Sequence, residues 1–269
     1  MKRKVNKMVI LNHELKMGRK MLIIWTLSIG FMVVLCMLLY PQMSGQVSQV
    51  EDVYSNMGGF TEAFGMDKVS IATPMGFYGI ECGNVLSIGC SFFVALLGAN
   101  MLSKEEHSHT AEFLLTHPIS RYRVIFEKLL AVVMQIIILN VVCMILGILS
   151  FYIIDEHILW KEFMLFHVAQ FFMQMEIAFI CFGISSFLKR SSVGIGIGIA
   201  VLMYFFNIIS NISDKAEFLK YITPLRYADA TQIISSGSIE GNLVLLGMLY
   251  AGIGVITAFL YYSKKDISV

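Results

Sequence analysis

MLIIWTLSIGFMVVLCMLLY, residues Met21–Tyr40, contains no charged side chain and is followed by Pro41. A helix needs about 20 consecutive apolar residues to cross the hydrocarbon core of a bilayer. Five further apolar runs follow this first span. We expect them to cross at about Gly79–Leu102, Leu129–Ile154, Phe163–Leu188, Val193–Ile209 and Asn242–Tyr262. The sequence therefore predicts an all-α membrane protein with six transmembrane helices.

Composition agrees with this fold class. The 269 residues are 57% hydrophobic and 14% charged, with a mean hydropathy of +0.73. Soluble domains carry about 25% charged residues, so a soluble globular fold is excluded. We interpret residues 1–269 as one transmembrane domain. A phosphate-binding G-x-x-x-x-G-K-[ST] loop is missing from the sequence, so any ATP used by this protein is bound by another chain.

The basic residues predict the orientation of the chain. If both termini are cytoplasmic, fifteen of the 20 Lys and Arg residues lie on that side, as the positive-inside rule requires. Met1–Lys20 lacks the pattern of a cleavable signal peptide. Its apolar residues fall at helical spacing among basic ones, which predicts an amphipathic helix in the membrane interface. We expect a multi-pass protein of a bacterial plasma membrane.

The outer segment Asn211–Gly241 is half apolar and contains Pro224. One interpretation is a pair of short helices that dip partway into the outer leaflet and satisfy their own backbone groups. The other is a loop that rests on the lipid headgroups.

A charged interlude, Leu102–Lys128, separates the second and third spans. It contains an acidic pair, then a short run, Thr110–Thr116, that can form an amphipathic helix, then Pro118 and several basic residues. An ordered amphipathic element beneath a membrane is suited to docking a soluble partner.

Polar residues inside the spans are candidates for the transport path. Glu176 lies near the middle of its span, where a carboxylate costs about 2.5–3.5 kcal/mol and should face protein or water. It either lines a path or bridges two helices through hydrogen bonds. His167, Gln170 and Gln174 share one helix face, with Asn140 and Gln135 as possible partners. The candidate path comprises Glu176, Gln170, Gln174 and Asn140, and no catalytic, cofactor or metal site is expected.

The interlude resembles the cytoplasmic segment of ABC-2 type permeases, the membrane subunits of one class of ABC exporter. The corresponding residues are Glu105, Glu106, Thr110, Glu112, Leu114, Leu115, Pro118, Ser120, Arg121 and Lys128. The turn within Ser185–Ala200 and the ending Tyr261–Ile267 are also similar to that family. The similarity extends over nearly the whole chain.

This resemblance implies a permease subunit of an ATP-driven exporter of an amphipathic substrate such as a peptide antibiotic or drug. Its partners would be a separate ABC ATPase, a second permease copy or related permease, and the lipid bilayer, with no nucleic acid. ATP and Mg would be held by the ATPase. The interlude helix would be the coupling helix, contacting the ATPase through Glu105, Glu106, Thr110, Glu112, Leu114, Leu115, Pro118 and Arg121.

Two other classes compete with this interpretation. An ion-coupled secondary transporter would need an inverted repeat and broken helices, which the two halves do not visibly show. An intramembrane protease is suggested by Phe163-x-x-x-His167 together with Glu105 and Glu106. That pair lies at the cytoplasmic edge, whereas His167 lies near the outer end of its span, so the two cannot share a water.

Overall fold

The computed structural model describes residues 8–44, 58–107, 119–190 and 193–265, and these form helices without a strand. Six helical segments are long and apolar enough to cross a membrane, which confirms the predicted fold class. They are α1 (Val9–Ser44), the segment Pro74–Met101, α8 (Arg121–Ile153), α9 (Trp160–Ser185), α10 (Val193–Ile212) and α12 (Gly241–Lys264).

The remaining elements are short. The second span is composed of α4 (Pro74–Phe77), a π-helical turn η1 (Tyr78–Cys82) and α5 (Gly83–Met101). Outside the spans lie α3 (Gly59–Ala63), α6 (Lys104–His107), the 3₁₀ helix η2 (Asp214–Tyr221) and α11 (Ala230–Ser236). The outer segment therefore contains two short helices, η2 and α11.

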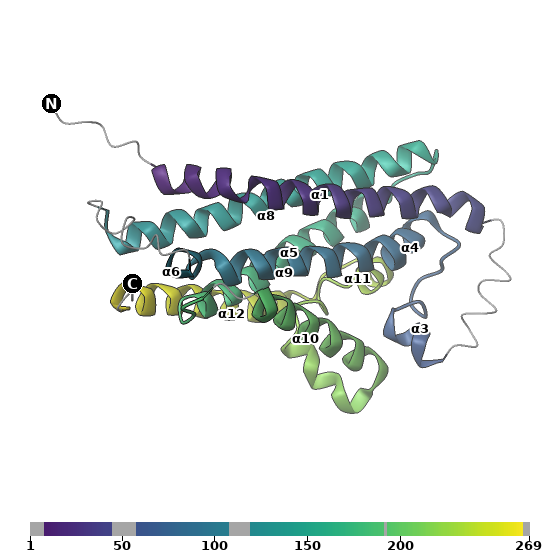
Figure 1. Cartoon of the computed structure of the whole chain (residues 1–269). Coiled ribbons are helices and arrows are strands. Elements are labelled where there is room, and N and C mark those ends of the chain that lie inside the picture. Colours follow the sequence, from purple (N-terminus) through teal and green to yellow (C-terminus); the bar gives the residue numbers. More distant parts are fainter. Residues whose placement is uncertain (1–7, 45–57, 108–118, 191–192, 266–269) are drawn as a thin grey trace.

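The bundle has two distinct ends (Figure 1). The first turn of α1, the short α6 and the last turn of α12 lie together at what we call the terminal end, on the left of the view. The helices α3, α4 and α11 lie at the opposite, distal end. The first and last described helices therefore end on the same side, as six spans require.

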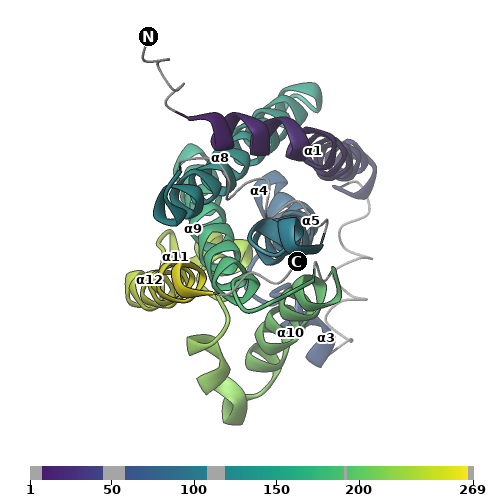
Figure 2. The same ribbon diagram turned by 60° about the vertical axis from the view of Figure 1, so that its left-hand side comes forward.

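Two helices form the centre of the bundle. In α5 and α9, 61% of the most apolar stretch is buried, against 22–33% in the other four spans. Figure 2 shows α5 and α9 between α1 and α8 on one side and α10 and α12 on the other. The outward faces of the outer helices carry large apolar side chains such as Leu245 and Ile253, which suits contact with lipid.

The described N-terminal region differs from the expected separate interfacial helix, because α1 runs unbroken from Val9 to Ser44. The face of its first turns that carries Ile10 and Glu14 is buried in the protein. Pro41, expected to end the span, lies inside the last turn of α1.

The helix that contains the third span also extends before the expected span, since α8 begins at Arg121 and the span was expected from Leu129. Ser120 explains this start, since its hydroxyl accepts a hydrogen bond from the backbone N–H of Arg123 and caps the helix. As a result Arg121, Arg123 and Lys128 project from helix α8, at defined positions, in the last part of the interlude.

The central contact between α9 and α12 depends on two glycines that face each other. A Cβ atom at Gly183 would lie 2.6 Å from the backbone oxygen of Gly254, and one at Gly254 would lie 2.4 Å from the backbone oxygen of Phe179. Small residues of this kind let transmembrane helices approach closely. The two backbones are therefore held in direct contact.

Candidate functional site

Six charged residues from four parts of the chain meet at the terminal end. We call this group the terminal charge cluster: Glu14, Lys104, Glu105, Glu106, Lys128 and Lys265. Lys128 is fully buried, and Glu14 and Glu106 are only 2% and 6% exposed. Burying a charge costs several kcal/mol unless a partner compensates it, so three acids and three lysines balance one another here.

Lys128 occupies the centre of the cluster. Its Nζ lies 2.7 Å from Glu14 Oε1, donates a hydrogen bond to the backbone oxygen of Met101 (2.9 Å) and pairs with Glu105. Lys104 pairs with the other oxygen of Glu14. One ammonium group thus connects α1, the end of α5 and α6 to its own helix, α8.

Charged side chains also cap the helix ends at this side. The Oε2 atom of Glu127, in α8, accepts hydrogen bonds from the first N–H groups of α1, at Ile10 (2.9 Å) and Leu11 (3.1 Å). Its Oε1 atom accepts one from Arg123 Nε (2.7 Å). A carboxylate is favourable at a helix N-terminus because the unpaired N–H groups there carry partial positive charge.

Cations occupy the complementary positions at helix C-termini. Lys265 Nζ donates to the backbone oxygen of Leu188 (2.8 Å), just beyond α9, and lies 2.7 Å from Glu106 Oε1. The Nη1 atom of Arg121 donates to the backbone oxygens of Lys265 (2.6 Å) and Ser263 (3.4 Å) at the end of α12. Each contact has the sign that the helix dipole favours, worth up to ~2 kcal/mol when partly buried.

The structure thus brings together three of the predicted coupling residues, Glu105, Glu106 and Arg121. Their described contacts are internal ion pairs and helix caps. The other predicted coupling residues lie outside the described part of the chain: Thr110, Glu112, Leu114, Leu115 and Pro118.

Sequence reasoning missed Glu14, Lys265 and Glu127 as members of this site. One signal was available: Glu14 is the single acidic residue in the basic segment Met1–Lys20. Another was the spacing of Arg123 and Glu127, which places them on one helix face.

A second group of polar residues lies along the face of α9 that His167, Gln170 and Gln174 share, and we call this group the seam. The side chains of His167 and Tyr78 are hydrogen-bonded, with 3.0 Å between Nε2 and Oη. The Nε2 atom of Gln170 donates to Ser87 Oγ (2.8 Å) and to the backbone oxygen of Ala228 (3.1 Å).

One turn further along α9, Asn140 Nδ2 donates to Gln174 Oε1 (2.7 Å). The seam therefore connects α9 to η1, α5, α8 and the segment before α11, and its interhelical hydrogen bonding is confirmed. Gln135, the other expected partner, instead donates to the backbone oxygen of Ala131 in its own helix.

Glu176 faces the other side of α9. Its carboxylate accepts a hydrogen bond from Tyr227 Oη (2.8 Å) and is 2% exposed. A Cβ atom at Gly247, in α12, would lie 1.9 Å from Glu176 Oε2, so the glycine leaves the space that the carboxyl group fills. The structure thus shows how the mid-span carboxyl group is accommodated, by a hydrogen bond and close packing between α9 and α12.

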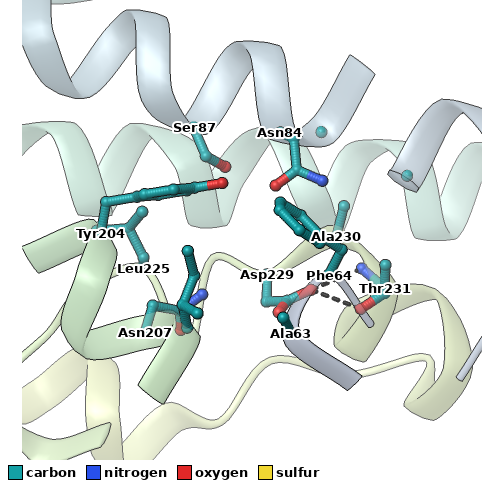
Figure 3. A pocket seen from close by; sticks show the side chains of 13 residues that line it. Ala63, Phe64, Asn84, Ser87, Tyr204, Asn207, Leu225, Asp229, Ala230 and Thr231 are labelled. Carbon is teal, nitrogen blue, oxygen red and sulfur yellow. Dashed lines mark hydrogen bonds between the residues drawn. The ribbon is translucent and has the colours of Figure 1, made fainter. Parts of the chain in front are cut away.

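A small polar cavity lies between α5, α10 and α11 (Figure 3). Its volume is about 30 Å³, enough for one or two water molecules. Ser87 and Asn84 line it from α5, and Tyr204 and Asn207 from α10. Asp229 faces Thr231 in the same wall and caps α11, accepting hydrogen bonds from Thr231 N (2.9 Å) and Oγ1 (2.7 Å). Ligand pockets for drug-sized molecules measure roughly 300–1,000 Å³, so this cavity does not hold such a cargo.

The geometry does not support the intramembrane protease. His167 is bonded to Tyr78 in η1, whereas Glu105 follows the far end of α5. At 1.5 Å per residue, Tyr78 and Glu105 are separated by roughly 40 Å of helix. A histidine and a carboxylate this far apart cannot activate one water molecule.

Six apolar helices around a polar seam, with charges gathered at one end, define a polytopic α-helical membrane protein. The chain matches the family described as "ABC-2 family transporter protein" over residues 8–267, and it belongs to that family. The predicted resemblance to ABC-2 type permeases is thereby confirmed.

A relative from Bacillus subtilis (strain 168) is similar to most of this chain. It is described as "Uncharacterized protein YhcI" and is 24% identical over 201 residues. The match covers 65% of this chain and spans 64% of that relative's length.

Proposed function

We propose that this chain is the permease subunit of an ATP-driven exporter. A separate ABC ATPase binds ATP and Mg, and the chain pairs with a second copy of itself or a related permease. The complex exports an amphipathic substrate such as a peptide antibiotic or a drug. The observation that carries this proposal is family membership over 8–267 in a chain whose sequence lacks a phosphate-binding loop.

The position of the interlude supports the ATPase contact. The described parts of the interlude, α6 and the start of α8, lie at the terminal end beside the first turn of α1. Most of the basic residues fall on this side, which supports a cytoplasmic location for it, at the inner face of a bacterial plasma membrane. An ATPase in the cytoplasm then contacts the interlude, which contains the residues expected to form the coupling helix.

We assign the transport path to Asn140, Gln170, Gln174 and Glu176. In the described structure their side chains hydrogen-bond to neighbouring segments. Transport requires the helices to move apart, and the same amide and carboxyl groups then become available to a polar part of the cargo. Gln170, Gln174 and Glu176 are buried and Asn140 is half-buried among apolar side chains, so these four are the polar contacts that a passing amphipathic molecule meets.

Isolation of the tagged chain from native membranes tests this function. We expect an ABC ATPase subunit to co-purify and Mg-ATP to drive a fluorescent amphipathic dye across the membrane of vesicles that contain the complex. A Walker-lysine variant of that ATPase is the matched control and should abolish transport. Dye movement by the chain alone, driven by an ion gradient, would favour the secondary transporter instead.

A further inference from the structure

We propose that the terminal charge cluster makes the ends of α1, α5, α8, α9 and α12 move as one rigid block. Lys128 is its central positioning residue. A displacement applied to the interlude is thereby delivered to all five helix ends together. This inference rests on the proposed function for the source of the displacement, while the block itself is a property of this chain alone.

The covalent chain connects the interlude to two spans only. The interlude begins directly after α5, includes α6 and ends in the first turns of α8. A force applied between them would therefore act directly on α5 and α8, and the ends of the other helices would respond through apolar packing and the neutral hydrogen bonds of the seam. Such packing is nondirectional and allows helices to slide.

The cluster supplies the missing connections to α1. Lys128 of α8 pairs with Glu14, and Glu127 of the same helix caps the N–H groups of Ile10 and Leu11. Lys104 holds the second oxygen of Glu14 from α6. The start of α1 is thus fixed from both sides of the interlude.

A second set of contacts reaches α12 and α9. From α6, Glu106 pairs with Lys265, whose Nζ also donates to the carbonyl of Leu188 beyond α9. From α8, Arg121 donates to the carbonyl of Lys265. The two sides of the interlude therefore converge on one residue after α12, and that residue also holds the end of α9.

Burial makes these contacts resistant to sliding. Separating a desolvated ion pair leaves charges that water cannot reach, so the pairs open together or remain closed. The side chains of Lys128 and Glu106 are 0% and 2% exposed in their ion pairs. By contrast the pair between Lys220 and Glu217 in η2 has a 60% exposed carboxylate and provides a matched control.

Distances between spin labels test the block. Labels are attached at Met17→Cys on α1 and Leu260→Cys on α12, both exposed positions, with the half-buried Cys36 replaced by alanine. In the wild-type background we expect one narrow distance distribution for the chain alone in nanodiscs. Lys128→Met should broaden and shift it, Lys128→Arg should restore it in part, and Lys220→Met should leave it unchanged.

The same labels in the complex with the ATPase separate a positioning role from a merely stabilising one. We expect Mg-ATP trapped with vanadate to leave the α1–α12 distance unchanged in the wild type. In Lys128→Met we expect nucleotide to change that distance, because α1 and α12 no longer follow the interlude together. A nucleotide-dependent distance in the wild type, or a Lys128→Met chain that matches the wild type under both conditions, would overturn the proposal.

Lys265→Met is the second variant, should Lys128→Met fail to fold, since it removes only the contacts to α9 and α6. It should shift the same distance without nucleotide, and a wild-type distribution there would also count against the block. If no ATPase associates with the wild-type chain, the proposed function fails, whereas the nucleotide-free distances still decide whether the block exists.

Discussion

The two ends of the bundle are held together by different chemistry. At the terminal end, buried lysines and glutamates from distant parts of the chain form ion pairs. Toward the distal end, neutral hydrogen bonds dominate, such as Tyr78 with His167 and Tyr40 with the backbone oxygen of Ala72 (2.8 Å). Among the described residues, the two ion pairs at that end have exposed carboxylates, at Glu217 and Glu240.

Because of this difference, the terminal end is suited to transmitting force and the rest of the bundle is suited to rearrangement. Removing one partner of a buried ion pair costs about 3–5 kcal/mol. A neutral hydrogen bond contributes only about 0.5–1.5 kcal/mol. The hydrogen bonds along the seam can therefore exchange for water or cargo at small cost, while the terminal end keeps its shape.

The largest effect is expected at the centre of the cluster. Lys128→Ala leaves Glu14 and Glu105 buried with fewer compensating charges, and it should destabilise the chain by about 3–5 kcal/mol. Thermal unfolding in detergent measures this loss. A change no larger than that of a surface substitution would show that water reaches the cluster and that the two ends do not differ.

A slightly smaller effect is expected where α12 packs on Glu176. Gly247→Ala places a methyl group within 1.9 Å of the Glu176 carboxylate and should cost about 1–3 kcal/mol through overpacking. Gly252→Ala is the control in the same helix, since open space surrounds that position. Adding Glu176→Ala to Gly247→Ala should recover part of the loss, and equal effects of the two glycine variants would contradict the packing.

The seam should respond more weakly. Asn140→Ala removes both hydrogen bonds with Gln174, of 2.7 and 3.4 Å, and should cost about 0.5–1.5 kcal/mol because the second is long and weak. In a double-mutant cycle with Gln174→Ala, the double variant should lose less stability than the sum of the two single losses, because both substitutions remove the same contact. Strict additivity of the two unfolding free energies would mean that the pair does not interact.

The exposed pair in η2 should show the smallest effect. Lys220 Nζ donates a hydrogen bond to Glu217 Oε1 (2.6 Å) and so holds the pKa of that carboxyl below its usual value. The pair is solvated, so Lys220→Gln should leave thermal stability and ATPase association unchanged. A loss of thermal stability comparable to that of Lys128→Ala would show that the buried and the exposed ion pairs contribute equally, against our account.

The sequence was sufficient for features that depend on local pattern. Each span could be predicted from its apolar run, because about 20 consecutive, predominantly apolar residues can do little else than cross a bilayer. The spacing of His167, Gln170 and Gln174 showed that they share a face of α9. The number of candidate hydrogen-bond partners was small, because polar side chains inside apolar spans usually pair with one another.

Contacts across long sequence separations could not be predicted. Glu14 and Lys128 are 114 residues apart, and nothing in either local sequence points to the other. The same holds for Gly247, whose role depends on the carboxyl group of another helix. The early start of α8 was missed since Arg121–Lys128 is charged, although Ser120 supplies a helix cap.

The central claim is that ATP hydrolysis by another chain exerts a force on the interlude. The terminal charge cluster then distributes this force to the ends of the other helices. Mg-ATP hydrolysis by the co-purified complex in vesicles tests it most directly, with the wild type compared with Lys128→Met. We expect both complexes to assemble, and dye transport per ATP hydrolysed to fall in the variant while hydrolysis continues. Equal transport per ATP in the two complexes would contradict the account.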